Sequence, residues 1–268
     1  RALRSTAVGQ CAKDQGFPLI EPRSLWSQDL NKQLTALTPD LFVVVAFKIL
    51  PKSLIDLPRF GALNLHASLL PKYRGAGPIQ WALMNGDTTT GVTVFQITPD
   101  VDTGDILLQQ EIAIAADDTM WTLGMRLCEA GAELVIEAMD ALETGSISGR
   151  PQDPALATPA PKITKEMTLI DWSWPAEKIH NWVRGLSPFP GMVTTIGGKQ
   201  FRIFKTAVLD RNGNEPGTIV EFHNGSLVIA TGDGLLSLLE VQIEGKKKMP
   251  AADFLRGATL KAGDRLGL

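Results

Sequence analysis

The sequence predicts two domains: an α/β domain on an open, doubly wound and mostly parallel sheet, and then a small β-barrel domain. Three observations predict this division. Strand and helix patterns alternate over the first half of the chain, whereas short strands follow one another in the last third. Residues 1–161 carry 12 Lys and Arg against 18 Asp and Glu, and residues 162–268 carry 14 against 11. Four prolines among residues 150–161 indicate an extended linker, so we expect domains at 1–149 and 162–268.

The first domain is expected to alternate helices with strands. Apolar spacings of three and four residues predict helices at residues 5–15, 30–37 and 78–85, and a long helix capped by Asp118. Short apolar stretches predict strands at residues 18–20, 41–46, 61–66, 91–97 and 105–112. The continuous apolar run at 41–46 is typical of a strand buried on both faces, as in a parallel sheet. This order of elements predicts the doubly wound sheet.

The second domain is expected to be built from short strands. One helix at residues 176–184 precedes strands at 192–196, 200–208, 217–222, 226–230 and 235–243. Gly197-Gly198 and Asn224-Gly225 lie between neighbouring strands, where tight hairpin turns need such residues. Five short strands after one helix are typical of a small Greek-key barrel of the OB type.

Composition excludes several classes of protein. Of 268 residues, 44% are hydrophobic and 21% are charged, which is typical of globular domains, and the net charge of −3 argues against a polybasic nucleic-acid protein. Two cysteines cannot form a disulfide framework and suit a reducing compartment. The longest apolar run, residues 41–47, is far shorter than a membrane helix needs. The start lacks a secretory signal and an initiator Met, so we expect a cytoplasmic and incomplete chain.

Two side chains stand out at the end of the strand predicted at 61–66. Asn64 and His66 are two residues apart, so on a strand they point to the same face, about 6–7 Å apart. Ligands of open α/β sheets bind just beyond the carboxyl ends of strands, where an amide and an imidazole could stabilise a developing oxyanion. A single histidine at a strand end is also common as a hydrogen-bonded core residue. The pattern alone leaves both interpretations open.

A loop at residues 98–104 holds two carboxylates, Asp100 and Asp102, between two predicted strands. A carboxylate there could orient His66 or accept a proton, although turns also use Asp, Pro, Thr and Gly for backbone reasons alone. Ser68 with His66 and Asp102 has the composition of a nucleophilic triad, but Ser68 lies in no G-x-S-x-G turn.

Other chemistries have no motif in this chain. There is no G-x-G-x-x-G or G-x-x-x-x-G-K-[ST] segment, so no dinucleotide or nucleoside triphosphate site is expected. Three scattered histidines and no C-x-x-C motif argue against a metal site. A run of three lysines at residues 246–248 is either a solvated face or a phosphate contact.

The stretch from residue 64 to residue 112, which begins NLHASLLPKYRGAG, resembles the folate-dependent formyltransferases. The resemblance rests on Asn64, His66, the SLLP segment and Asp102. Segments at residues 170–172, 179–191 and 245–249 resemble the C-terminal barrel of those family members that act on methionyl-tRNA. The resemblance covers nearly all of the chain. It implies a Rossmann-like catalytic domain of which one βαβ unit, roughly 30 or more residues, lies before residue 1.

The resemblance implies an activity in translation initiation. The formyl group would pass from 10-formyltetrahydrofolate to the α-amino group of initiator methionyl-tRNA. Asn64 and His66 would donate hydrogen bonds to the oxyanion of the tetrahedral intermediate. Asp102 would orient His66 and help to move protons from the attacking amine. Direct attack by the amine requires no metal, nucleophilic side chain or covalent intermediate.

The resemblance also implies where the substrates bind. Folate is expected to contact Phe47, Lys48, Ile49, Leu50, Ser68, Leu69, Leu70 and Pro71. The tRNA is expected to contact Arg1, Arg4, Arg74, Lys246, Lys247 and Lys248. We expect a monomer that binds no membrane.

Two other classes of function stay open on the sequence. A sugar-nucleotide or other amine formyltransferase, or a formyl-folate hydrolase, could share Asn64, His66 and Asp102, although the basic second domain favours tRNA. A non-catalytic RNA-binding module could use the barrel alone, but the intact set of three polar residues argues against it.

Overall fold

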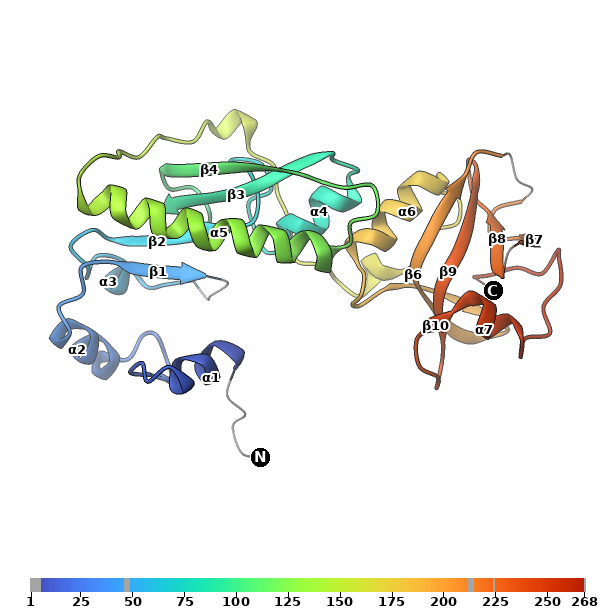
Figure 1. Ribbon diagram of the computed structural model, residues 1–268, viewed down its shortest axis with the longest axis horizontal. Helices are drawn as coiled ribbons and strands as arrows, with labels where there is room; N and C mark the ends of the chain where they lie inside the picture. Colours follow the sequence, from blue (N-terminus) through green and yellow to red (C-terminus); the bar gives the residue numbers. More distant parts are fainter. Residues whose placement is uncertain (1–5, 46–48, 212–214, 224, 268) are drawn as a thin grey trace.

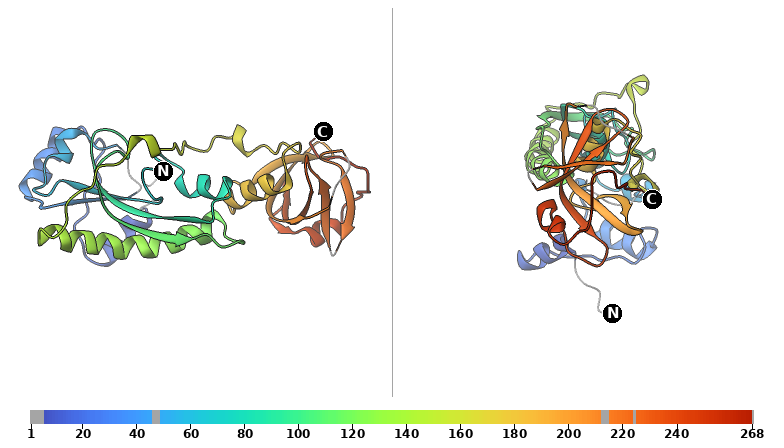
Figure 2. Two further views of the ribbon diagram at one scale, coloured as in Figure 1. Left: turned by 90° about the horizontal axis from the view of Figure 1, so that it is seen from above. Right: turned by 90° about the vertical axis from the view of Figure 1, so that its right-hand side faces the viewer.

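The computed structural model describes residues 6–45, 49–211, 215–223 and 225–267 and shows an elongated molecule of two domains side by side (Figures 1 and 2). The first domain holds a sheet with the strand order β1-β2-β3-β4. Its strands are β1 (Phe42–Val45), β2 (Ala62–His66), β3 (Thr89–Gln96) and β4 (Ile106–Ala113). Its helices are α1 (Ala7–Asp14), α2 (Gln28–Ala36), α3 (Lys52–Ile55), α4 (Pro78–Met84) and α5 (Met120–Glu143).

The α/β class is confirmed, and the sheet is mixed. Strands β1 and β2 are parallel, as expected, whereas β2 with β3 and β3 with β4 are antiparallel. Only nine residues separate β3 from β4. A parallel pair needs a crossover of a dozen or more residues, so this connection forms a hairpin instead.

Three local predictions were wrong. Strand β1 is not buried on both faces, because it lies at the edge of the described sheet, and Val43 and Val45 are 42% and 54% exposed. No strand is described at residues 18–20, where Pro18 lacks an N–H group and its apolar neighbours are exposed. The N-cap of α5 is Thr119 rather than Asp118, whose carboxylate accepts a hydrogen bond from the Ala115 amide instead.

Helix α5 determines which face of β2 is free for the site. Its buried positions Leu123, Leu127 and Leu134 pack with Leu63 in one apolar cluster, as their spacing predicted. Leu65 packs against the same cluster. Because side chains alternate along a strand, Asn64 and His66 face the opposite side of the sheet.

The second domain is all-β with one main helix, as predicted. It contains α6 (Ala176–Gly185) and α7 (Ala251–Leu255), with strands β5 (Met192–Ile196), β6 (Lys199–Leu209), β7 (Ile219–His223), β8 (Ser226–Ala230), β9 (Leu235–Ile243) and β10 (Met249–Pro250). The strand order is β5-β6-β9-β8-β7, with β10 beside β9. The C-terminal segment joins the two ends, since the Gly267 amide donates to the Thr195 carbonyl and the Leu266 amide donates to the Gly217 carbonyl. These bonds close the sheet into a barrel.

The two domains share a packed interface. Met84 of α4 is buried in the same apolar cluster as Ile179 and Val183 of α6. Arg184 donates hydrogen bonds to the carbonyls of Asp118 and Ala115 in the first domain, and its burial lowers the pKa of its guanidinium. The predicted linker, residues 150–161, contains one 3₁₀ turn (Pro154–Leu156) and runs along the first domain (Figure 2). None of the helices in the described ranges has both the length and the apolar character to cross a membrane.

Candidate active site

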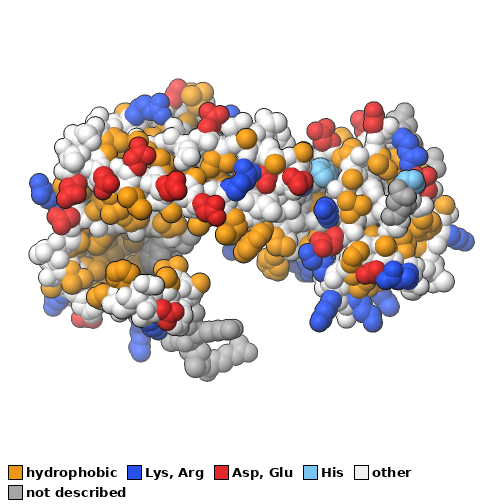
Figure 3. All heavy atoms as spheres, in the orientation of Figure 1, with side chains coloured by type: hydrophobic (Ala, Val, Ile, Leu, Met, Phe, Trp, Pro, Cys, Tyr) orange, Lys and Arg blue, Asp and Glu red, His pale blue; other side chains and the backbone are white. Residues whose placement is uncertain are grey.

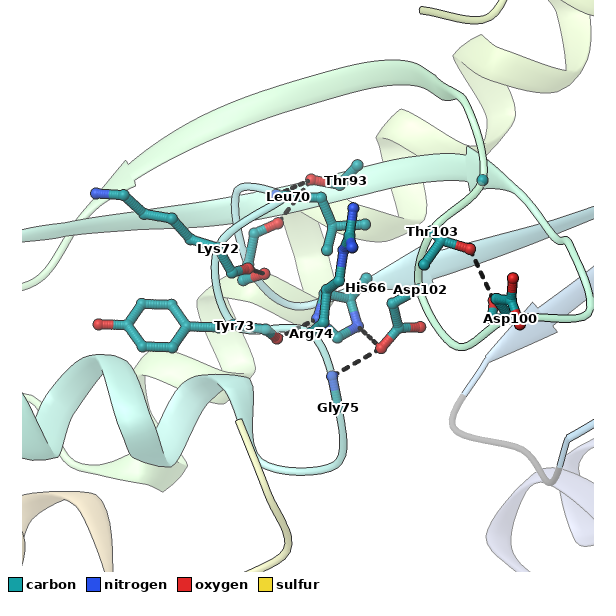
Figure 4. A network of polar contacts seen from close by, with 12 residues as sticks. His66, Leu70, Lys72, Tyr73, Arg74, Gly75, Thr93, Asp100, Asp102 and Thr103 are labelled. Carbon is teal, nitrogen blue, oxygen red and sulfur yellow. Dashed lines mark hydrogen bonds and ion pairs between the residues drawn. The ribbon is translucent and has the colours of Figure 1, made fainter. Parts of the chain in front are cut away.

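His66 lies at the carboxyl end of β2 and is only 6% exposed. Its Nε2 atom lies 2.8 Å from the Tyr73 carbonyl oxygen (Figure 4). A carbonyl oxygen can only accept a hydrogen bond, so Nε2 carries a proton and donates it. The ring nitrogen left for proton exchange or for a ligand is therefore Nδ1.

Asp102 faces that nitrogen. Its Oδ2 atom lies 3.7 Å from His66 Nδ1 and accepts a hydrogen bond of 2.8 Å from the Gly75 amide (Figure 4). The first distance is longer than a direct hydrogen bond, so the pair interacts through charge when the imidazole is protonated. Of the two predicted carboxylates, only Asp102 approaches His66, because Asp100 lies at the exposed tip of the loop. His66 is thus a buried, hydrogen-bonded histidine whose second ring nitrogen faces a carboxylate.

The β3–β4 loop holds Asp102 in an unusual backbone conformation. Its φ angle is +54°, in the left-handed region that residues other than glycine seldom adopt. Tyr73, whose carbonyl binds His66, has a φ angle of +62°. The Tyr73 hydroxyl donates to Asp87 and accepts from Asn85, and burial raises its pKa to about 12. Backbone strain therefore lies on both sides of the imidazole.

Asn64 and Asp102 line one cleft. Its lining also includes Phe95, Ile49, Leu50 and residues of the β3–β4 loop, whereas His66 does not line it. The Oδ1 atom of Asn64 is buried and has no hydrogen-bond partner among the described residues. A buried acceptor without a partner is costly, so this atom fits a ligand that brings an N–H group.

The predicted folate residues separate into three groups. Ile49 and Leu50 line the cleft, whereas Phe47 and Lys48 lie outside the described residues. The turn at 68–71 does not line this cleft. Ser68 is fully buried with its hydroxyl donating to the Lys72 carbonyl, which excludes the nucleophilic arrangement with His66. Residues 69–71 continue this turn, and Leu70 packs in one apolar cluster with Phe95.

The predicted tRNA residues lie in two places. The Arg74 guanidinium is next to the site and donates two hydrogen bonds to Gln152. Lys246 and Lys247 are exposed on the connection between β9 and β10, and Lys248 forms a 2.8 Å ion pair with Glu240. Lys and Arg gather on the lower part of the second domain (Figure 3). Arg1 and Arg4 lie outside the described residues.

Sequence reasoning missed the groups that hold the pair in place. These are the Tyr73 carbonyl, the Gly75 amide and the Gln152 side chain. The first two are backbone groups, which no motif of side chains reveals. Gln152 lies 50 residues from Asp102 in the chain, so no local spacing connects them. Within the described ranges, no three His, Cys, Asp or Glu side chains converge to form a metal site.

Two family models match most of the chain. The family model described as formyl transferase matches residues 1–139, and the model described as formyl transferase, C-terminal domain, matches residues 162–259. The chain belongs to the formyl transferase family.

Individual relatives show which members of the family this chain is similar to. The chain is 43% identical to the methionyl-tRNA formyltransferase of Geobacter metallireducens, over 96% of this chain and 82% of that protein. It is 46% identical to the protein of the same name from Acidobacterium capsulatum, over 97% and 85% of the two chains. Among solved structures, HypX from Aquifex aeolicus in complex with tetrahydrofolic acid is similar with a TM-score of 0.66 and 22% identity, over 90% of this chain and 44% of that one. The last similarity shows the fold alone.

Proposed function

We propose that the protein transfers the formyl group of 10-formyltetrahydrofolate to the α-amino group of initiator methionyl-tRNA. One observation carries the proposal. Asn64 and Asp102 line one cleft, with His66 Nδ1 3.7 Å from the Asp102 carboxylate, in a chain similar over most of its length to relatives named for this reaction.

Asn64 and His66 act on the formyl group itself. When an amine attacks the carbon of a formyl group, negative charge develops on the formyl oxygen. The Asn64 amide donates an N–H to that oxygen, and its unpartnered Oδ1 accepts an N–H of the attacking amine. His66 contributes the Nδ1 proton, because its Nε2 proton is held by the Tyr73 carbonyl. Each such donor lowers the activation free energy enough to raise the rate about 10²–10³-fold.

Asp102 acts through His66 and through water. Its carboxylate orients the imidazole and takes up, through water, the proton that the amine loses as the new bond forms. The Gly75 amide holds the carboxylate from the other side. The C–N10 bond then breaks, and the proton taken from the amine passes to N10 as tetrahydrofolate leaves. The formyl group thus passes directly to the amine, and none of the three side chains becomes covalently modified.

The folate is proposed to occupy the cleft beside Ile49 and Leu50. It is also proposed to contact Phe47 and Lys48, which lie outside the described residues. The turn of Ser68, Leu69, Leu70 and Pro71 is proposed to support the site, because Thr93 and Gln109 form hydrogen bonds with the backbone of Ser68 and Leu70. The tRNA is proposed to contact Arg74 near the cleft, Lys246, Lys247 and Lys248 on the barrel, and Arg1 and Arg4 at the start of the chain. We propose a monomer that acts in the cytoplasm, where methionyl-tRNA is used.

The test is a formyl-transfer assay with three acceptors. The protein is incubated with 10-formyltetrahydrofolate and either methionyl-tRNA, a nucleotide-linked amino sugar or water alone. Formation of formyl-methionyl-tRNA, with much slower transfer to the sugar and to water, supports the proposal. Faster formylation of the sugar, or release of formate without an acceptor, would contradict it.

A further inference from the structure

The interdomain segment contacts the backbone that binds His66. The Thr158 hydroxyl accepts a hydrogen bond from the Tyr73 amide, and its carbonyl accepts one from the Arg74 amide, both at 2.8 Å. The Ala160 amide donates to the Arg74 carbonyl at 2.7 Å. This part of the segment therefore holds Tyr73, whose carbonyl meets His66, and Arg74, which directly precedes the Gly75 amide that meets Asp102.

Gln152, in the same segment, contacts the other half of the site. Its Nε2 atom donates to the carbonyls of Asp102 and Gly104, at 3.0 and 2.8 Å. Its Oε1 atom accepts from Nε and Nη2 of Arg74, at 3.1 and 2.7 Å. Both N–H groups and the oxygen of the amide are thus used. One side chain connects the Asp102 loop to the residue that follows Tyr73.

The Asp102 loop needs such an external support. The φ angle of Asp102 is unfavourable for a residue with a side chain, and a relaxed loop would turn the carboxylate elsewhere. At Gly104 the chain passes so close to β3 that a Cβ atom would lie 1.7 Å from the Gln96 carbonyl oxygen. The carboxylate itself meets only the Gly75 amide and His66 among the described contacts. Its direction therefore depends on how the loop backbone is held.

We propose that Gln152 is a positioning residue for the formyl-transfer reaction, which holds the Asp102 loop and Arg74 so that the Asp102 carboxylate faces His66 Nδ1. This inference rests on the proposed function. It assigns a role in catalysis to the segment that leads into the second domain. Gln152 itself touches neither the reacting atoms nor the cleft.

The experiment compares three variants of the full chain. Gln152→Met keeps the size of the side chain and removes all four hydrogen bonds. Gln152→Glu keeps the acceptor for Arg74 but loses both donors and directs an oxygen toward two carbonyl oxygens. Gln33→Met is the matched control, because Gln33 is an exposed glutamine on α2 whose amide bonds Asp29. We measure kcat and both KM values for formyl transfer, together with the thermal unfolding of each variant.

We expect Gln152→Met and Gln152→Glu to lower kcat about 10- to 100-fold, the effect of a misplaced catalytic group, with the KM for folate within about twofold of the parent. The KM for tRNA is expected to rise in Gln152→Met, because this variant also releases Arg74. The control should keep the parent kcat. An unchanged kcat in folded Gln152→Glu would overturn the proposal. If the Met variant does not fold, Gln152→Asn replaces it, since the shorter amide cannot reach both the loop and Arg74. A parent-like kcat there would also overturn it.

A double variant separates positioning from general damage to the fold. If Gln152 acts through Asp102, then Gln152→Met should lower kcat less than about twofold in an Asp102→Asn protein. A full additional loss in that background would overturn the proposal. The Asp102→Asn variant by itself distinguishes failure of the proposed function from failure of the positioning role of Gln152. If that variant keeps the parent kcat, the proposed function of the site fails, whereas a slow Asp102→Asn with a normal Gln152→Met defeats the positioning role alone.

Discussion

The loops around His66 and the turns of the barrel use backbone conformation in different ways. Among the described residues, Thr38, Tyr73 and Asp102 have positive φ angles although each carries a side chain, and the last two adjoin His66. In the barrel, the described positive φ angles all fall on glycines, which adopt them at little cost. The first domain therefore stores strain where it positions polar groups, whereas the barrel is an unstrained scaffold for an exposed basic surface. The difference suggests that substitutions in the two regions should affect different measurements.

The largest effect is expected for Asp102→Asn. The substitution keeps the shape of the side chain and removes the charge that faces His66 Nδ1. We expect kcat to fall by about 10²–10⁴-fold, as for other carboxylates that orient a catalytic imidazole. Binding of folate, measured by fluorescence titration, should change little, since the charge acts on the reaction. Loss of folate binding in parallel with activity would contradict this role.

Asn64→Leu should separate activity from stability. It removes the amide that is proposed to stabilise the oxyanion, so we expect kcat to fall by about 10²–10³-fold. It also removes a buried acceptor without a partner, so the free energy of unfolding should rise by about 1 kcal/mol. Denaturant unfolding and steady-state kinetics on the same sample test both parts. A less stable variant would show that the Asn64 amide supports the fold.

Two glycine substitutions compare the two regions directly. Gly75→Ala introduces a Cβ atom 2.6 Å from the Ala160 carbonyl oxygen, at a φ angle of +125°, next to the amide that holds Asp102. We expect it to cost about 2–3 kcal/mol of stability and to lower kcat. Gly245→Ala in the barrel has a φ angle of +77° and no described atom within 4 Å of the new Cβ, so about 1 kcal/mol is expected without loss of kcat. If both glycine variants lowered kcat equally, the proposed difference between the catalytic domain and the barrel would be wrong.

The sequence predicted the side-chain directions of the site better than its surroundings. The alternation along β2 was enough to place Asn64 and His66 opposite the apolar cluster under α5. The approach of Asp102 to His66 depends instead on a strained loop and on Gln152, neither of which leaves a periodic pattern. The exposure of Val43 was not predicted for a related reason. An apolar run shows that a strand is hydrophobic, but it does not show how many strands lie beside it. Local sequence patterns predict which face of a strand a side chain occupies. Contacts between distant segments determine which strand lies at the edge of the sheet and how a loop is held.

The smallest effect is expected on the barrel surface. Lys246→Ala and Lys247→Ala each remove an exposed charge, and if both lysines contact phosphate, each should lower the slope of log affinity for tRNA against log salt by about one. Lys248→Ala should change that slope less, because Glu240 and the Phe204 ring already engage its ammonium group. Filter binding between 50 and 200 mM salt measures these slopes, and kcat at saturating tRNA should stay at the parent value. A fall in kcat without any change in slope would show that this surface acts on the reaction centre, and the division between a strained catalytic domain and an unstrained binding barrel would then be wrong.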